Sequence, residues 1–335
     1  AYDELCHRLG SEPALAVRSS ALDEDAAGLS FAGQYHSVLN VRRGQLLSAY
    51  REVIAGMYTA QAIEYRRQRG LRVDSNRMCV GFLTMIDGRS GGVAYTGDPV
   101  DPGDRDVRIS ASLGLPVVVV DGRLPTDTIV VSRDEPRRIL EHSVATKEWR
   151  HVCDPQEGVA RQQVPEAERR APALTAEQAL SLADQALRLE AHFGSPQDVE
   201  WVLDREGRLL VLQSRPLQQV ARVDRESARR EAGEPLLGGG LCDSPGVAAG
   251  PVCWVRRESD AMAFPEGAVL VLPQPLPRYA ALLGRAVAVV SERGGLAGHL
   301  ATVAREMGRP AIFAAQGIER LREGQVVTVD ADGPG

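Results

Sequence analysis

The stretch that most constrains the fold of this chain is a charge-dense segment about two thirds of the way along it. Residues 220–235 have many charged side chains and no apolar periodicity, and three glycines follow at 238–240. Such a segment offers no apolar face to a core, and consecutive glycines let the backbone bend. We therefore expect a linker at 220–240 between a first domain, residues 1–219, and a small second domain, residues 241–335.

The composition is that of a globular protein with more than one compact unit. The chain has 335 residues, of which 44% are hydrophobic and 25% charged, and a chain of this length usually divides into two or three units. Its 39 basic and 45 acidic residues leave a net charge of -6, which argues against binding to nucleic acid by bulk electrostatics. Lys147 is the single lysine, so a phosphate clamp has to be built from arginines or from Lys147 itself.

The cysteines and the hydropathy pattern favour a cytoplasmic location. The five cysteines show no paired spacing, which argues against a disulfide framework or a zinc site. They are Cys6, Cys79, Cys153, Cys242 and Cys253. No apolar run reaches the length of a membrane span, and the N-terminus lacks the layout of a signal peptide. Because the sequence opens at Ala1 without a methionine, a processed or truncated piece is one interpretation.

The first domain is predicted to mix strands and helices. Alternating or short apolar runs predict strands at 14–17, 37–41, 78–86, 92–96, 107–112, 117–120 and 128–131. The turn signal at 87–91 predicts that the third and fourth of these form a hairpin. Apolar residues at helical spacing predict helices over 45–68 and 176–193.

A second hairpin, over 198–216, carries polar residues in a chemically informative order. Asp198 and Glu200 lie two apart on one strand, and Gln213 and Arg215 return on the next. Residues two apart share a face, and cross-strand neighbours lie within reach of each other. Carboxylate and amide oxygens suit magnesium, and arginine suits phosphates. The alternative interpretation is an exposed face laced with salt bridges.

The second domain is predicted to set one short helix among five short strands. The strands are expected at 253–255, 269–272, 286–290, 311–314 and 326–329. The helix begins near His299, directly after a glycine-rich turn, and ends before Pro310. A helix N-terminus disfavours imidazolium and favours an approaching anion, which suits a neutral histidine that accepts a phosphoryl group. The alternative is a histidine that only caps the helix or bonds within its loop.

Together these motifs resemble the phosphoenolpyruvate synthase and pyruvate phosphate dikinase family, which includes the rifampin phosphotransferases. The segments similar to its nucleotide-binding region are Ala16-Val17-Arg18-Ser19-Ser20, Ser30-Phe31-Ala32-Gly33-Gln34, Leu39-Asn40-Val41, 194–201 and Gln213-Ser214-Arg215-Pro216. The segments similar to its mobile phosphohistidine domain are 244–250 and 294–311. The resemblance runs over nearly the whole chain, in the order of the family.

The resemblance implies an α/β (α+β) chain in which a partial ATP-grasp-like domain precedes a small swivelling β/β/α phosphohistidine domain. The implied reaction uses ATP and Mg²⁺: the histidine takes the β-phosphate, AMP is released, and the phosphoryl group passes to pyruvate or another small acceptor. The residue implied as phosphoryl carrier is His299. Those implied to bind nucleotide are Arg18, Ser30, Gly33, Gln34, Asp198 and Arg215, and those implied to hold the metal are Glu200 and Gln213.

The chain departs from the family pattern at several positions. A Gly-Leu-Gly-Glu element reads Leu113-Gly114-Leu115-Pro116, a glutamine is replaced by Leu83, and the triplet ending in the histidine is Ala297-Gly298-His299. The family's glycine- and lysine-bearing first segment, its acceptor barrel and its drug-binding helices have no counterpart in these residues.

Three hypotheses follow. The first is a dikinase-type phosphotransferase whose acceptor site lies on a separate protein or domain. The second is a degenerate homologue that binds nucleotide or a partner without turnover. The third is a fragment of a longer synthase.

Overall fold

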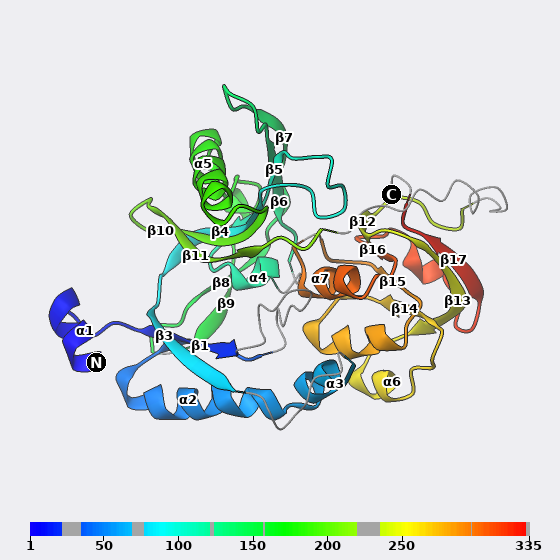
Figure 1. Cartoon of the computed structure of the whole chain (residues 1–335), viewed down its shortest axis with the longest axis horizontal. Coiled ribbons are helices and arrows are strands. Elements are labelled where there is room, and N and C mark those ends of the chain that lie inside the picture. The colour runs from blue at the N-terminus through cyan, green and yellow to red at the C-terminus, as the bar shows by residue number, and fades with distance from the viewer. Residues whose placement is uncertain are drawn as a thin grey trace.

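A computed structural model describes residues 1–21, 35–68, 77–120, 124–156, 158–219, 235–295 and 297–332 (Figure 1). Its helices are α1 (Tyr2–Leu9), α2 (Leu46–Ala55), α3 (Ala60–Gln68), α4 (Val117–Val120), α5 (Ala176–Phe193), α6 (Glu258–Met262) and α7 (His299–Glu306). Its short 3-10 helices are η1 (Arg43–Gln45), η2 (Gly56–Tyr58), η3 (Glu166–Glu168), η5 (Pro277–Gly284) and η6 (Ile318–Arg320). The predicted mixture of helices and strands is confirmed.

The N-terminal part contains three sheets. The first, in the order β2-β1-β3, consists of β1 (Leu15–Ala21), β2 (Val38–Val41) and β3 (Met78–Thr84). The second, in the order β11-β10-β4-β5-β6-β7, consists of β4 (Gly88–Tyr95), β5 (Val107–Leu113), β6 (Asp127–Val131), β7 (Ile139–Ser143), β10 (Gln197–Asp204) and β11 (Leu209–Pro216). The third is the pair β8 (Trp149–Cys153) and β9 (Val159–Gln163). All of these pairings are antiparallel.

The C-terminal part is built on one mixed sheet in the order β12-β16-β15-β14-β13-β17. Its strands are β12 (Leu241–Ser244), β13 (Val247–Trp254), β14 (Val269–Leu272), β15 (Ala288–Ser291), β16 (Ala311–Phe313) and β17 (Val326–Asp330). The four central strands are parallel, and β12 and β17 pair antiparallel at the two edges. Helix α7 connects β15 to β16, so the end of β15 and the turn after it deliver the start of α7.

Helix α5 covers one face of the six-stranded N-terminal sheet. Its start is fixed by a capping box, in which the Thr175 hydroxyl accepts from the Gln178 N–H and the Gln178 side chain accepts from the Thr175 N–H. Its buried face packs on a core that includes Ile109, Ile129 and Trp201. This core holds β10 in place, and β10 carries Asp198 and Glu200.

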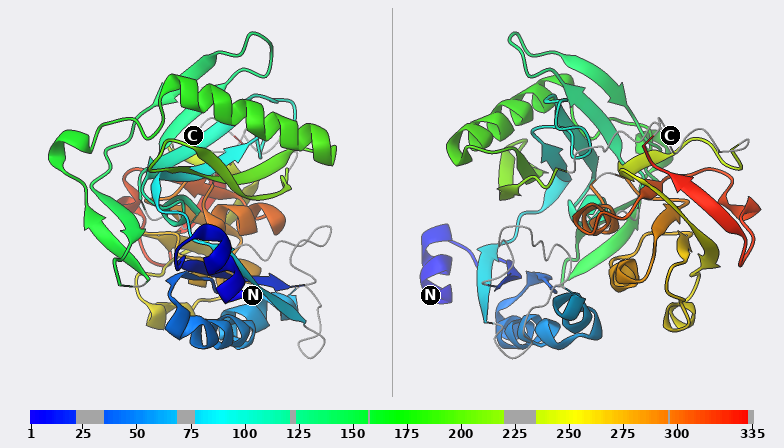
Figure 2. Two further views of the ribbon diagram at one scale, coloured as in Figure 1. Left: turned by 90° about the vertical axis from the view of Figure 1, so that its left-hand side faces the viewer. Right: turned by 45° about the vertical axis from the view of Figure 1, so that its right-hand side comes forward.

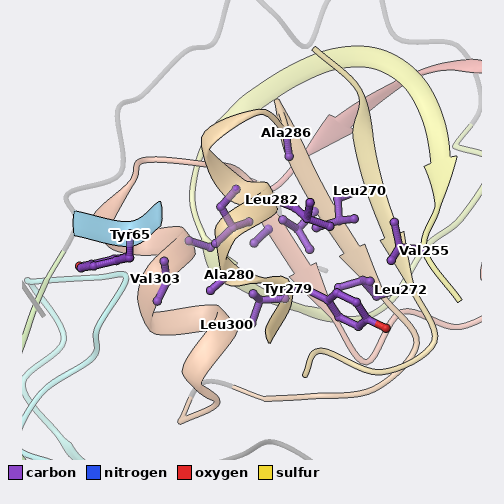
Figure 3. Packing of buried hydrophobic residues seen from close by; sticks show 14 of the residues in the cluster. Tyr65, Val255, Leu270, Leu272, Tyr279, Ala280, Leu282, Ala286, Leu300 and Val303 are labelled. Carbon is purple, nitrogen blue, oxygen red and sulfur yellow. The ribbon is translucent and has the colours of Figure 1, made fainter. Parts of the chain in front are cut away.

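The two parts of the chain share a core. Figure 3 shows Tyr65 of α3 at the edge of the C-terminal cluster, beside Val303 of α7. Met57 and Ala62 of the N-terminal part belong to the same buried cluster. Figures 1 and 2 both place α7 on the side of the C-terminal part that faces the N-terminal sheets. Apolar burial therefore holds α7 against the N-terminal part.

Three local predictions were wrong. The expected hairpin of 78–86 and 92–96 does not form, because β3 pairs with β1 while β4 lies between β10 and β5. Strand β4 is buried along nearly its whole length, so it takes a partner on each side. The turn residues at 87–91 therefore did not indicate which strands pair with β3 and β4.

The other two errors concern helices. Residues 117–120 form α4 rather than a strand, because Pro116 favours a helical first turn and its carbonyl accepts from the N–H groups of Val119 and Val120. The single helix expected over 45–68 is interrupted after α2, and Thr59 starts α3 by accepting from the Ala62 N–H at 3.2 Å.

Candidate active site

Strands β10 and β11 form the predicted polar hairpin. The register pairs Asp198 with Arg215 and Glu200 with Gln213. Val199, which lies between the two acidic residues, points the other way into the core. The alternation therefore places all four polar side chains on one face, as the sequence predicts.

Asp198 and Arg215 form a close ion pair at the end of this hairpin. Oδ2 of Asp198 accepts from Nε of Arg215 at 2.8 Å and lies 2.7 Å from its Nη2. Burial opposes the charge on Arg215, but the carboxylates of Asp198 and Glu200 outweigh it and raise the pKa of the guanidinium. Arg215 is thus a fixed cation beside two acids.

Arg18 joins the cluster from β1, which belongs to a different sheet. Its Nη2 donates to Oε1 of Gln213 and lies 3.8 Å from Oε2 of Glu200. The structure therefore brings together the predicted phosphate ligands Arg18 and Arg215 and the predicted metal ligands Glu200 and Gln213. The alternative of an exposed, salt-bridged face is right about the ion pairs but wrong about the exposure, because Asp198 is only 7% exposed.

The donor set fits a magnesium ion that is shared with nucleotide phosphates. Glu200 and Gln213 offer hard oxygen ligands, and the two arginines offer charge for phosphate oxygens. No group of three or more His, Cys, Asp or Glu side chains suited to a metal occurs among the described residues. Two protein ligands leave the remaining positions to phosphate oxygens and water, which is how magnesium usually binds beside nucleotides.

The turn before α7 depends on glycine. Gly294 has φ 115, and a Cβ there would lie 2.8 Å from Pro275 and 2.9 Å from Phe313. A side chain would be strained by the backbone and blocked by both neighbours. The Gly298 N–H donates to the Gly295 carbonyl at 2.8 Å, and Gly298 is the N-cap of α7. This turn sets His299 at the first position of the helix, as predicted.

His299 is buried and neutral. It is 2% exposed, and burial, together with the nearby positive charge of Arg215, lowers the pKa of its imidazole to about 3. A neutral imidazole has a lone pair available for attack on phosphorus. The neutral state of the imidazole is caused mainly by burial, whereas the sequence analysis attributed it to the helix N-terminus.

The histidine and the hairpin meet at the junction of the two parts. Tyr95 of β4 is paired in register with Asp198, and the positive charge of Arg215 lowers the pKa of the imidazole. Ala297, two residues earlier, shares a buried cluster with Val93 and Tyr95 of β4. Two constellations that lie far apart in the sequence therefore form one site.

Four further polar residues at this junction were not predicted. Tyr95 is buried, and burial followed by the charge of Asp198 raises the pKa of its phenol, so it stays protonated. Asp98, Asp243 and Arg305 are also buried close by. Their signal in the sequence is only a polar side chain inside or next to an apolar run, at 95–98, 242–244 and 303–305.

The structure does not place the other predicted residues in this site. Ser30, Gly33 and Gln34 lie outside the described residues. Lys147 is buried against Asp127, to which its Nζ donates, and Nζ also donates to the Ala145 carbonyl at 3.0 Å. The single lysine therefore supports the N-terminal core rather than a phosphate.

The departures from the family pattern have visible places in the fold. Leu83 is exposed on β3, Pro116 begins α4, and Ala297 and Gly298 form the turn before His299.

In the described part of the chain, none of the helices is both long enough and apolar enough to cross a bilayer.

Comparison with known proteins agrees with this arrangement. The model of the family "Pyruvate phosphate dikinase, AMP/ATP-binding domain" matches residues 1–234, and that of "PEP-utilising enzyme, mobile domain" matches residues 264–333. The probable phosphoenolpyruvate synthase of Pyrococcus horikoshii is 33% identical over 98% of this chain and 41% of its own length. The phosphoenolpyruvate synthases of Pyrococcus furiosus and Deinococcus radiodurans are 34% and 33% identical, over 98% of this chain and 42% and 43% of their own lengths.

The chain therefore spans less than half the length of these relatives. The matches nevertheless cover both the hairpin cluster and the turn that carries His299. The chain belongs to the pyruvate phosphate dikinase family, with an AMP/ATP-binding domain followed by the mobile domain of PEP-utilising enzymes.

Proposed function

We propose that this chain is an ATP-dependent phosphotransferase of the dikinase type, in which His299 carries the phosphoryl group. The observation that carries the proposal is the buried, neutral imidazole of His299 beside Arg215. A neutral nitrogen nucleophile next to a fixed cation suits attack on an anionic phosphate.

The N-terminal part would act as a partial ATP-grasp-like domain. Arg18 and Arg215 would bind phosphate oxygens, and Asp198 would keep the Arg215 guanidinium in place at 2.7–2.8 Å. Glu200 and Gln213 would hold Mg²⁺, which offsets phosphate charge when bound. The segment containing Ser30, Gly33 and Gln34 would cover the triphosphate, as the resemblance implies.

His299 would attack the β-phosphorus of ATP, so that a bond from imidazole nitrogen to phosphorus forms and the bond to the α–β bridging oxygen breaks. AMP leaves with that oxygen, and the γ-phosphoryl group then passes to water or to phosphate. The C-terminal part, a swivelling domain after the linker at 220–240, would carry the phosphohistidine to pyruvate or another small acceptor. The acceptor site would belong to another domain or protein.

Labelling with ATP that carries ³²P on the β-phosphate tests this proposal. We expect an acid-labile, base-stable label on the protein, one AMP for each label, and no label on His299→Asn. The asparagine variant keeps a polar side chain at the helix start and should bind ATP as the parent does. Nucleotide binding without label on the parent chain would contradict the proposal.

That outcome would favour the second candidate, a homologue that binds nucleotide or a partner without turnover. The turn composition supports this candidate, because Ala297 and Gly298 provide no hydroxyl next to the nucleophile. The intact mass of the natural protein would test the third hypothesis, that this chain is a fragment of a longer synthase.

A further inference from the structure

Asp243 is the most unusual polar group at the junction of the two parts. It lies on β12, in the C-terminal part, and is fully buried. Neither carboxyl oxygen has a hydrogen-bond partner among the described residues. A buried carboxylate without such partners costs several kcal/mol, and a carboxyl group escapes this cost by binding a proton.

The charged groups around Asp243 come from both parts of the chain. The charges that act on its carboxyl are those of Arg305 on α7, which lowers its pKa, and of Asp98 in the loop after β4, which raises it. A negative charge on Asp243 also raises the pKa of the Tyr95 phenol on β4. The Asp98 carboxylate has hydrogen-bond donors: its Oδ1 accepts from the N–H groups of Val100 and Asp101 at 2.7 and 3.1 Å.

Asp98 also pairs with Arg108, whose Nε lies 2.8 Å from Oδ2 of Asp98. Both carboxyl oxygens of Asp98 thus have partners, whereas neither carboxyl oxygen of Asp243 has one among the described residues, so Asp243 is the one that takes a proton. Burial raises the pKa of Asp243 to about 8, Arg305 opposes the rise, and Asp98 adds to it.

A chain of hydrogen bonds leads from the backbone carbonyl of Asp243 to Gly298, the residue before the nucleophile. The Arg305 guanidinium donates to the Asp243 backbone carbonyl at 3.3 Å and to the Thr302 hydroxyl at 3.2 Å. The Thr302 hydroxyl donates in turn to the Gly298 carbonyl at 3.4 Å. Gly298 directly precedes His299, so Arg305 supports the turn that places the imidazole.

We propose that Asp243 is a positioning residue for His299: it binds one proton when the C-terminal part docks on Asp98, and in its neutral form it leaves Arg305 to hold the start of α7 through Thr302. This rests on the proposed function, because it assumes that docking places His299 for transfer. Ionised Asp243 would repel Asp98 and draw the Arg305 guanidinium toward its own carboxylate.

Because docking and proton binding are linked, docking depends on pH in a definite direction. In the docked state the pKa of Asp243 is about 8, and to the extent that undocking returns the carboxyl to water its pKa falls toward the ordinary value of about 3.9. The contribution of Asp243 to docking therefore weakens as the pH rises toward 8 and levels off above about pH 8. His299 affects docking only below about pH 6.5, the pKa of a free histidine, so it does not contribute above that pH.

The test compares the parent chain with Asp243→Asn, since asparagine resembles the protonated aspartate in shape and charge. The measurement is the single-turnover rate of His299 labelling at saturating Mg·ATP from pH 6 to pH 9. We expect the ratio of the variant's rate to the parent's rate to rise with pH and to be at least about tenfold larger at pH 8.5 than at pH 6. Taking the ratio of the two rates removes pH effects that both chains share, including those of ATP.

Thr302→Val removes the hydroxyl with little change in shape. We expect it to slow labelling at every pH by roughly tenfold, the value of one or two hydrogen bonds, with unchanged affinity for ATP. Thr302→Ser should restore the rate. This rescue separates positioning from general packing.

Parallel pH profiles for the parent and Asp243→Asn would overturn the inference while leaving the proposed function intact. A variant that labels slowly at all pH values would do the same, because it would show a structural role only. Absence of label on both chains across the whole pH range, with ATP bound, would instead contradict the proposed function.

Discussion

At the scale of single residues, the chemistry depends on where charges are buried. Burial, followed by the charge of Arg215, lowers the pKa of His299, and burial raises the pKa of Asp243. The same loss of water lowers the pKa of a base and raises the pKa of an acid. Burial thus favours the uncharged form of both groups.

We expect the imidazole of His299 to show no titration between pH 5 and 8. Its pKa of about 3 lies well below this range. Protonation becomes costly for the docked state as the pH falls from about 6.5, the value of a free histidine, toward 3. NMR of protein with ¹³C-labelled histidine, assigned by His299→Asn, would measure this. A midpoint above pH 5 would show that the imidazole is exposed to water.

At the scale of secondary structure elements, local patterns were reliable where one face of an element alternates. The hairpin of β10 and β11 has the predicted register, so Asp198, Glu200, Gln213 and Arg215 share a face as expected. Helix α5 has the predicted bounds because its apolar spacing, its N-cap and Gly194 all agree. The failures were in pairing and in a short valine run, which depend on neighbours from elsewhere in the chain.

The buried pair of Lys147 and Asp127 is expected to be important for the stability of the N-terminal core. Asp127 also accepts from the N–H groups of Ala145 and Ala173, at 2.9 and 2.8 Å. Lys147→Met would leave an uncompensated buried carboxylate, and breaking one partner of such a pair costs about 3–5 kcal/mol. Urea denaturation would measure the loss.

The matched control for that change is Arg67→Met. Arg67 pairs with Glu64 on the surface, and its side chain is 77% exposed, so we expect no measurable loss of stability. Equal losses for the two variants would show that the buried pair has no special weight in stability.

At the scale of the whole molecule, contacts between distant segments hold the C-terminal part in place. Tyr65 of α3 donates to Oε2 of Glu306 on α7 at 3.0 Å, and it packs in the cluster shown in Figure 3. Leu300, Val303 and Ala304 of α7 belong to the same buried cluster as Tyr65, so the contact between the two parts is largely apolar.

We expect Tyr65→Phe to weaken docking without harming ATP binding. It removes one hydrogen bond to a charged group, worth about 1.5 kcal/mol, and keeps the aromatic packing. The rate of His299 labelling should fall by up to about tenfold. Tyr58→Phe is the control, because Tyr58 is 65% exposed. An unchanged rate for Tyr65→Phe would show that the Tyr65 hydroxyl does not contribute to docking.

The sequence by itself determined the chemical inventory and its local geometry: a histidine at a helix start, and two acids, a glutamine and an arginine on one hairpin face. These follow from periods of two and 3.6 residues and from the positions of glycine and proline, which short stretches contain. Only the tertiary structure decided that His299 meets Arg215, that Lys147 serves the core, and that Asp243 faces Asp98. Those outcomes depend on burial and on contacts between residues far apart in the chain, which no local pattern encodes.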